Sequence, residues 1–174
     1  MKEIEVKILE VDVPKIVKKL EDLGAKKTLD TEQEIIYFDN NERTFSKNNL
    51  LRLRKNGKVI ELAHKKKMSK KGVKIAEETE VHVSDFEKTR KILEGIGFRE
   101  IRKATKHRIS YHLPGVSFEL DTYPEVPTFL EIETEDEKLL KEYVKKLGFT
   151  MKDTKAWSGK DVLRYYGKLE DFNL

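Results

Sequence analysis

Glu3-Ile4-Glu5-Val6-Lys7-Ile8 stands almost at the start of the chain, and its charged and aliphatic side chains alternate one for one. Because successive side chains of a β-strand point to opposite faces, this period of two predicts a strand with one aliphatic and one charged face. A strand face in water commonly mixes both signs of charge with Thr and Ser. Like charges at positions 3 and 5 therefore indicate a sheet whose polar face has a task other than solvation.

Six further stretches repeat this alternation, and the charged face of most of them carries a single sign. The stretches are residues 51–54, 59–67, 78–83, 106–111, 118–121 and 130–133. The charged faces together present the acids Glu3, Glu5, Glu78, Glu80, Glu119, Asp121, Glu131 and Glu133, and the bases Lys7, Arg52, Arg54, Lys65, Lys67, Lys106 and Arg108.

Two arrangements fit such strands. In the first, an antiparallel sheet packs its aliphatic face on helices and turns its charged face to water. In the second, the sheet closes into a barrel with aliphatic faces outward under helices and charged faces inward. The segregation of acids and bases onto different strands favours the barrel, and the predicted fold class is an α+β fold built on an antiparallel β-barrel.

A charged interior restricts what the barrel can contain. An isolated buried charge is very unfavourable, so such an interior must be wet, ion-paired or filled by a highly charged ligand. Basic side chains bind anions, Arg through a planar fork and Lys as a point charge. Carboxylates without His or Cys beside them favour Mg²⁺ or Mn²⁺ over zinc. The sequence therefore predicts a site for a polyanion together with a divalent metal ion.

Three short helices are predicted to cover the outer face. Asp12 and Pro14 start the first, which Gly24 ends. Ser84 with Glu87, and Thr134 with Glu137, have the spacing of capping boxes, and the helices that follow end at Gly97 and Gly148. The lysine-rich stretch 65–74 is expected to be a loop, either a solvated hairpin or a segment that closes over the ligand.

Composition narrows the class of protein. A length of 174 residues fits one domain, residues 1–174. Charged residues make up 39%, yet the net charge is only +4, which does not indicate a plain nucleic-acid binder. The absence of Cys excludes a disulfide framework, thiolate zinc sites and a cysteine nucleophile. No apolar run is long enough for a membrane helix and the first residues lack a signal sequence, so a cytoplasmic location is expected.

Several motifs occur together in one order. They are Glu3-Ile4-Glu5-Val6-Lys7, Tyr37-Phe38-Asp39, Leu51-Arg52-Leu53-Arg54, Glu77-Glu78-Thr79-Glu80, Lys106 with Arg108, Glu119-Leu120-Asp121, and Phe129-Leu130-Glu131-Ile132-Glu133. Over nearly its whole length the chain thereby resembles the CYTH domain proteins, also called triphosphate tunnel metalloenzymes, which include class IV adenylyl cyclases and thiamine triphosphatases.

The resemblance implies an eight-stranded antiparallel tunnel that binds a triphosphate and Mg²⁺ or Mn²⁺. It assigns phosphate binding to Lys7, Arg52, Arg54, Lys65, Lys67, Lys106 and Arg108. It assigns metal binding to Glu3, Glu5, Asp121, Glu131 and Glu133, whereas Glu78, Glu80 and Glu119 either bind metal or act as counter-ions. Lys7, Arg54 and Glu131 are the expected catalytic residues.

The reaction stays open between two kinds of enzyme and a binding module. A class IV adenylyl cyclase would convert ATP to cyclic AMP and pyrophosphate, and a triphosphatase would hydrolyse inorganic or thiamine triphosphate. A binding module would capture a nucleotide, a polyphosphate or an RNA 5′-triphosphate end without turnover. Cyclisation needs a pocket for adenine, for which Phe129 is the nominated aromatic residue. The protein is expected to be a monomer or homodimer with no membrane partner.

The C-terminal part departs from the family pattern in two places. The stretch 154–163 resembles a Lys-Ser-Tyr and Leu-Leu ending but has Ala156 and Trp157 within it. Residues 124–128, Pro-Glu-Val-Pro-Thr, replace a glycine turn that precedes the last acidic strand in many members. The four histidines form no ligand cluster along the chain and are expected to be structural.

Overall fold

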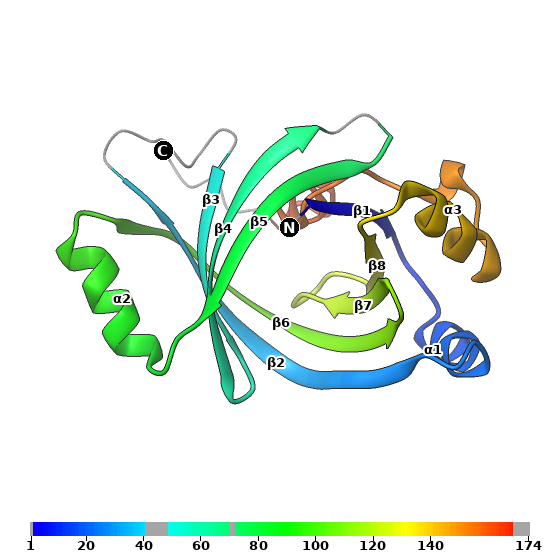
Figure 1. The fold of residues 1–174 in the computed structure, drawn as a ribbon, viewed down its shortest axis with the longest axis horizontal. Helices are drawn as coiled ribbons and strands as arrows, with labels where there is room; N and C mark the ends of the chain where they lie inside the picture. The colour runs from blue at the N-terminus through cyan, green and yellow to red at the C-terminus, as the bar shows by residue number, and fades with distance from the viewer. Residues whose placement is uncertain (1, 41–48, 70–71, 169–174) are drawn as a thin grey trace.

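The computed structural model describes residues 2–40, 49–69 and 72–168. Eight strands form a closed barrel in the order β1-β5-β4-β3-β2-β6-β7-β8, and every neighbouring pair is antiparallel (Figure 1). The strands are β1 (Lys2–Ile8), β2 (Lys26–Asp39), β3 (Asn49–Asn56), β4 (Val59–Ser69), β5 (Lys74–His82), β6 (Arg99–Leu113), β7 (Val116–Thr122) and β8 (Phe129–Thr134). The helices are α1 (Val13–Asp22), α2 (Phe86–Gly95), α3 (Glu137–Lys146) and α4 (Gly159–Tyr165), with a short 3-10 helix at Met151–Asp153. The prediction of an eight-stranded antiparallel barrel with helices outside is confirmed.

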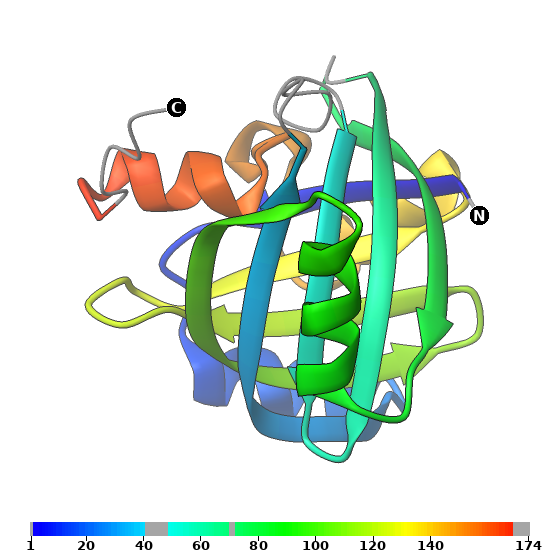
Figure 2. The ribbon, with the colours of Figure 1, turned by 90° about the vertical axis from the view of Figure 1, so that its left-hand side faces the viewer.

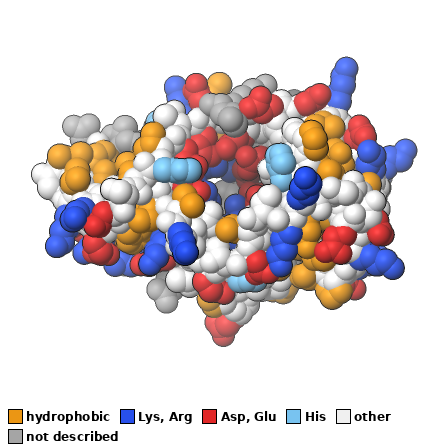
Figure 3. All heavy atoms as spheres, turned by 60° about the horizontal axis from the view of Figure 1, so that its bottom comes forward, with side chains coloured by type: hydrophobic (Ala, Val, Ile, Leu, Met, Phe, Trp, Pro, Cys, Tyr) orange, Lys and Arg blue, Asp and Glu red, His pale blue; other side chains and the backbone are white. Residues whose placement is uncertain are grey.

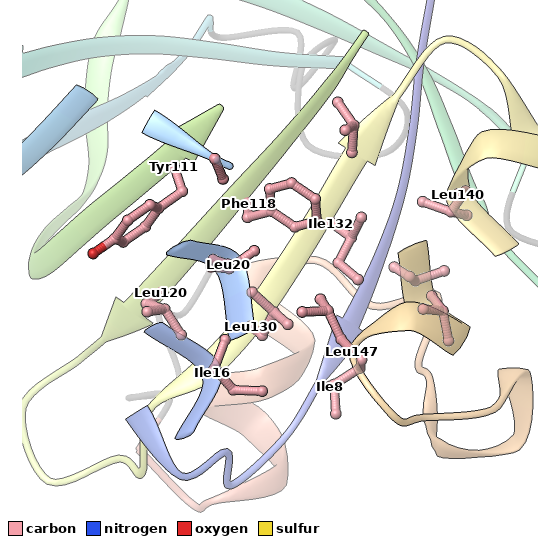
Figure 4. Packing of buried hydrophobic residues seen from close by; sticks show 14 of the residues in the cluster. Ile8, Ile16, Leu20, Tyr111, Phe118, Leu120, Leu130, Ile132, Leu140 and Leu147 are labelled. Carbon is pink, nitrogen blue, oxygen red and sulfur yellow. The ribbon is translucent and has the colours of Figure 1, made fainter. Parts of the chain in front are cut away.

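The largest apolar cluster lies between the outer face of β1, β7 and β8 and the helices α1 and α3. Ile16 and Leu20 of α1 and Leu140 of α3 meet Phe118 and Ile132 of the sheet, as Figure 4 shows. These strand residues alternate with the charged ones, so burying them directs the charged side chains to the other face of the sheet. The cluster therefore fixes which face of these strands points into the barrel.

Helix α2 covers the opposite side of the barrel. It packs on the outer face of the sheet and runs along β3 (Figure 2). Its Phe86 and Leu93 pack with Ile36, Phe38 and Leu53 of β2 and β3. The residues between these, such as Arg52 and Arg54, consequently face inward.

Helix α4 packs at one end of the barrel. Its Val162 and Leu163 lie in an apolar cluster with Tyr123, Val126 and Phe129. The rings of Tyr123 and Phe129 stack with centroids 6.2 Å apart. A Cβ on Gly159, the first residue of α4, would lie 2.8 Å from the Tyr123 hydroxyl, so only glycine permits this close approach. Phe129, nominated from the sequence as the residue that contacts adenine, is instead buried in this cluster and unavailable to a ligand.

Four local predictions are corrected by the structure. Asp85 rather than Ser84 caps α2, with its Oδ1 accepting from the Lys88 N–H at 2.8 Å. Asp136 rather than Thr134 caps α3, because β8 continues through Thr134. Carboxylates at these positions accept from the first turn and also favour the positive end of the helix dipole.

The other two corrections concern whole segments. Helix α4, capped by Ser158 and Asp161, was not among the three predicted helices. The stretch 65–74 is mostly strand and not loop, since β4 runs to Ser69 and β5 begins at Lys74, while residues 70–71 lie outside the described residues. The two strands pair antiparallel, which agrees with the hairpin among the two alternatives. No helix in the described part of the chain is both long and apolar enough to cross a membrane.

Candidate functional site

The charged faces of the strands meet inside the barrel. Contacts between strands that are not neighbours establish this: Lys65 Nζ of β4 lies 2.8 Å from Glu3 Oε2 of β1, although β5 separates the two strands. Arg108 of β6 likewise reaches Glu131 of β8 across β7, at 3.5 Å. Only side chains that share the interior can skip a strand in this way. Figure 3 shows a hollow in the surface where acidic and basic side chains gather.

Lys7 lies at the centre of one ion-pair group. Its side chain is 2% exposed, and its Nζ donates to Glu5 at 2.6 Å and to Glu131. Burial opposes the charged form, but the carboxylates of Glu131 and Glu5 outweigh it and raise the pKa of Lys7 above its ordinary value. Lys7 is therefore a permanently charged cation inside the barrel.

Asp121 organises a second group on β6 and β7. Arg108 donates to both of its oxygens, from Nε and Nη2 at 2.6 Å each, and Lys106 Nζ donates at 2.5 Å. Burial and the charge of Arg108 lower the pKa of Lys106 to about 7. Burial raises the pKa of the neighbouring Glu119 to about 7, although Arg108 opposes that shift. Two groups of this site thus titrate near neutral pH.

A third group joins β3, β4 and β5. Arg52 Nη2 lies 3.2 Å from Glu78 and 3.3 Å from Glu80, and Arg54 Nε lies 2.5 Å from Glu61. Burial opposes ionisation of Glu78, yet a hydrogen bond with Glu3 and the charges of Lys65 and Arg52 lower its pKa to about 2. These carboxylates hold the guanidinium groups in place facing the interior.

Glu3, Glu5 and Glu133 bring their carboxylates together, with one oxygen of each within 4.8 Å of the others. Burial, a hydrogen bond with Glu78 and the charge of Glu133 raise the pKa of Glu3 to about 8. Burial and the charges of Glu131 and Glu5 also raise the pKa of Glu133. Buried acids that repel one another in this way suit a hard divalent cation, which oxygen ligands prefer. The donor set therefore fits the predicted Mg²⁺ or Mn²⁺.

The other two predicted metal ligands are not part of this carboxylate cluster. Asp121 is paired with Arg108 and Lys106, and Glu131 with Lys7 and Arg108. Their role as metal ligands stays a prediction. Glu3 and Glu5 are ion-paired too, with Lys65 and Lys7, so the convergence with Glu133 is what distinguishes them. Glu78, Glu80 and Glu119 all contact basic side chains, the counter-ion alternative. Lys67 is exposed, unlike the other predicted phosphate-binding residues.

Further interior residues were left out of the predicted site. Lys74 lies 2.9 Å from Glu5, but it falls within the stretch expected to be a loop. Glu61 alternates with Ile60 and Leu62, which places it on the charged face of its strand with Lys65, but no role was assigned to it from the sequence. With Glu80 and His82 it forms a second group whose possible ligand atoms lie within 4.8 Å. Gln33 on β2 is uncharged, so a search for charged faces passed over it.

Comparison with known proteins agrees with this geometry. The family model described as the CYTH domain matches residues 1–166. The chain belongs to the CYTH domain family. Its members bind triphosphates, are adenylyl cyclase-like enzymes or triphosphatases, and are generally metal-dependent.

Three individual proteins illustrate what this CYTH domain is similar to. A Methanocaldococcus jannaschii protein named "Putative adenylate cyclase" is 32% identical over 149 residues, covering 82% of this chain and 85% of that protein. A solved Pyrococcus horikoshii protein is 28% identical with a TM-score of 0.78, over 92% of this chain and 98% of its own. A Hippeastrum protein described as a "putative adenylyl cyclase" with a dominant triphosphatase activity shares the fold at 19% identity and a TM-score of 0.64, covering 98% and 99% of the two chains.

Proposed function

We propose that this CYTH domain binds a triphosphate inside the barrel with a divalent cation at Glu3, Glu5 and Glu133, and catalyses attack of an oxygen nucleophile on phosphorus. The observation that carries the proposal is the position of this carboxylate cluster in the same interior as six buried or half-buried bases: Lys7, Arg52, Arg54, Lys65, Lys106 and Arg108. The cation, once bound, neutralises phosphate charge. The bases bind the remaining phosphate oxygens and stabilise the leaving group.

Charge balance supports binding of the anion and the cation together. The interior bases are already paired with carboxylates, so no surplus of positive charge awaits a polyanion. A phosphate that takes Arg108 from Asp121 leaves that buried carboxylate with Lys106 as its remaining cation, and the loss of a partner is unfavourable unless a further cation is present. A triphosphate bound with its metal ion satisfies both signs.

Adenylyl cyclase is the first candidate reaction. An open hollow of about 560 Å³ adjoins Lys106 and is lined by Tyr123, Pro124, Val126 and Pro127 together with the polar Glu32 and His107. A nucleoside in this hollow would leave its phosphates next to Lys106 and Arg108. The ribose 3′-oxygen then bonds to the α-phosphorus, the bond from that phosphorus to pyrophosphate breaks, and the hydroxyl proton leaves. The name of the Methanocaldococcus relative agrees with this candidate.

Triphosphate hydrolysis is the second candidate, and Lys106 favours it. With its pKa lowered to about 7, the Lys106 amine is partly neutral at neutral pH and accepts a proton from water as the water oxygen bonds to the terminal phosphorus. The P–O bond to the rest of the phosphate chain breaks, and its electron pair stays on the leaving diphosphate oxygen. The activity described for the Hippeastrum neighbour is of this kind. Both candidates use the same phosphate-binding residues and differ in the nucleophile.

Product analysis separates the candidates. The protein is incubated with ATP, thiamine triphosphate or inorganic triphosphate, each with Mg²⁺ or Mn²⁺, and cyclic AMP, pyrophosphate and phosphate are measured. Cyclic AMP from ATP identifies a cyclase, and phosphate release from inorganic triphosphate identifies a triphosphatase. If the protein binds all three triphosphates but forms no product, it is a binding module and the proposed catalysis is refuted.

A further inference from the structure

Gln33 is an uncharged side chain buried among the charged ones. Its side chain is on β2, where it is 1% exposed while Glu32 and Glu34 on either side are exposed. Its cross-strand partners are Asn56 of β3 and Lys106 of β6. Directly opposed residues of antiparallel strands project from the same face, and Lys106 reaches Asp121 inside the barrel. The amide of Gln33 therefore faces the interior beside Lys106.

The amide is satisfied at one end only. Nε2 donates to Asn56 Oδ1 at 3.1 Å, whereas Oε1 is buried without a partner among the described residues. A buried polar atom without a partner is unfavourable, and a methionine of similar volume would have no such atom. An acceptor kept at this position indicates a partner that arrives with the ligand.

The chemistry of Oε1 identifies that partner. An amide oxygen accepts hydrogen bonds and cannot donate them. A phosphate that is fully ionised offers only acceptors, so it satisfies the Nε atoms of Arg52 and Arg102, which also lack a partner among the described residues, but not Gln33 Oε1. The nucleophile of the proposed reaction, whether water or a ribose hydroxyl, carries the O–H donor that Oε1 requires.

Topology places this acceptor among the proposed phosphate-binding residues. In the closed order of strands, β2 lies between β3, which carries Arg52 and Arg54, and β6, which carries Lys106 and Arg108. Gln33 is the cross-strand partner of Lys106 and shares its interior face. A phosphoryl group bound by these bases therefore lies in the part of the interior that Gln33 faces, where Oε1 can contact a nucleophile that attacks in line with the leaving oxygen.

We propose that Gln33 Oε1 accepts a hydrogen bond from the attacking hydroxyl or water and aims its lone pair at phosphorus, an inference that rests on the proposed function. Gln33 takes no proton. As the new O–P bond forms, the P–O bond to the leaving phosphate or pyrophosphate breaks, its electron pair stays on the leaving oxygen, and the proton of the nucleophile passes to solvent.

Gln33→Met tests the proposal because it keeps the shape and removes the acceptor. With whichever triphosphate the wild type turns over, kcat is expected to fall about 10–100-fold, the loss typical of one transition-state contact, while KM stays within about threefold. The variant removes the unpaired acceptor but also the hydrogen bond from Nε2 to Asn56 Oδ1, and because these two effects oppose each other the melting temperature is expected to change little. Ile35→Met is the matched control, because Ile35 is a buried residue on the same face of the same strand, and its kcat is expected to stay within about threefold.

Each outcome decides a definite point. Unchanged kcat in Gln33→Met, or a loss matched by Ile35→Met, overturns the role of Gln33 and leaves the proposed function intact. No turnover by the wild type with any triphosphate overturns both. If Gln33→Met does not fold, Gln33→Glu decides instead, because it keeps an acceptor oxygen: kcat within about tenfold of the wild type supports the proposal, and a loss of about 10²-fold or more overturns it.

Discussion

Binding of Mg²⁺ by the proposed Glu3, Glu5 and Glu133 site should release a proton from Glu3. The pKa of Glu3 is raised to about 8, first by burial and then by Glu78 and Glu133. At pH 7 a group with this pKa is protonated in about nine molecules of ten, and at pH 9 in about one of ten. Because a carboxylate must lose its proton to ligate a metal, binding is expected to release about 0.9 proton at pH 7, or more if Glu133 contributes, and about 0.1 from Glu3 at pH 9.

Isothermal titration calorimetry measures this number directly. Mg²⁺ is titrated at each pH in two buffers that differ in ionisation enthalpy, and the difference in heat gives the protons released. Apparent affinity should also rise almost tenfold per pH unit below about 8 and then level off. Glu3→Gln is the control, in which the release at pH 7 falls by about 0.9 and affinity weakens. Binding without proton release at pH 7, or equal release by Glu3→Gln, would refute the assignment of Glu3.

The same pKa gives a stability test whose sign is fixed. The folded state raises the pKa of Glu3 above its unfolded value of 4.5, so the stabilisation is complete below about 4.5 and is lost as pH rises through about 8. Mg²⁺ should therefore raise the melting temperature more at pH 8.5 than at pH 6. An equal effect of Mg²⁺ at both values contradicts a protonated Glu3.

Three further predictions test single residues. Lys7→Met leaves the buried carboxylates of Glu5 and Glu131 without their shared cation. The free energy of unfolding, measured in urea, should therefore fall by about 3–5 kcal/mol, and a fall under about 1 kcal/mol contradicts the ion-pair role. If Lys106 is the base for hydrolysis, the hydrolysis rate should rise as pH increases through about 7. Lys106→Arg, which stays charged, should abolish that rise. If the variant keeps the pH profile of the wild type, Lys106 is excluded as the base. Glu131→Gln frees Lys7 and Arg108, so metal-free triphosphate binding measured by calorimetry should stay equal or tighten; weaker Mg²⁺ binding with no change for triphosphate would instead identify Glu131 as a metal ligand.

The barrel was predictable because its main signal is local. Charged and aliphatic residues alternate along each strand, and the period alone assigns every second residue to one face. Once Ile4 and Val6 are placed in an apolar core, Glu3, Glu5 and Lys7 must point the other way. Contacts such as Lys65 with Glu3 confirm the inward direction predicted from that parity.

The different environments of Glu131 and Glu133 depend on strand register, which the sequence does not reveal. Glu131 and Glu133 share a face of β8 and look equivalent along the chain. The pairing of β1 with β8 sets Glu133 opposite Glu5 and Glu131 opposite Lys7. One carboxylate therefore joins the acidic cluster, and its neighbour two residues away becomes an ion-pair partner. A shift of register by two residues would set Glu131 opposite Glu5, or Glu133 opposite Lys7, and no feature of either strand alone fixes the register.

Helix α4 was missed for a different reason. It has seven residues, and its buried residues Val162 and Leu163 are adjacent, so no helical period develops. The capping box of Ser158 and Asp161 was the available signal. Its packing on Phe129 also explains why an aromatic residue on the same face as Glu131 does not line the binding site.

The ion pairs that hold the interior together also determine how it responds to a ligand. Each basic group is bonded to a carboxylate, as Arg108 is to Asp121 and Lys7 to Glu131, so a phosphate must exchange with a bound partner. A phosphate that takes Lys7 from Glu131 leaves that carboxylate buried close enough to Glu5 and Glu133 to repel them, in a cluster where the pKa of Glu3 and of Glu133 is already raised. A divalent cation relieves that repulsion, and each ligand consequently lowers the free energy of binding the other. Linkage makes this effect reciprocal, so the triphosphate must increase affinity for the metal by the same factor as the metal increases affinity for the triphosphate.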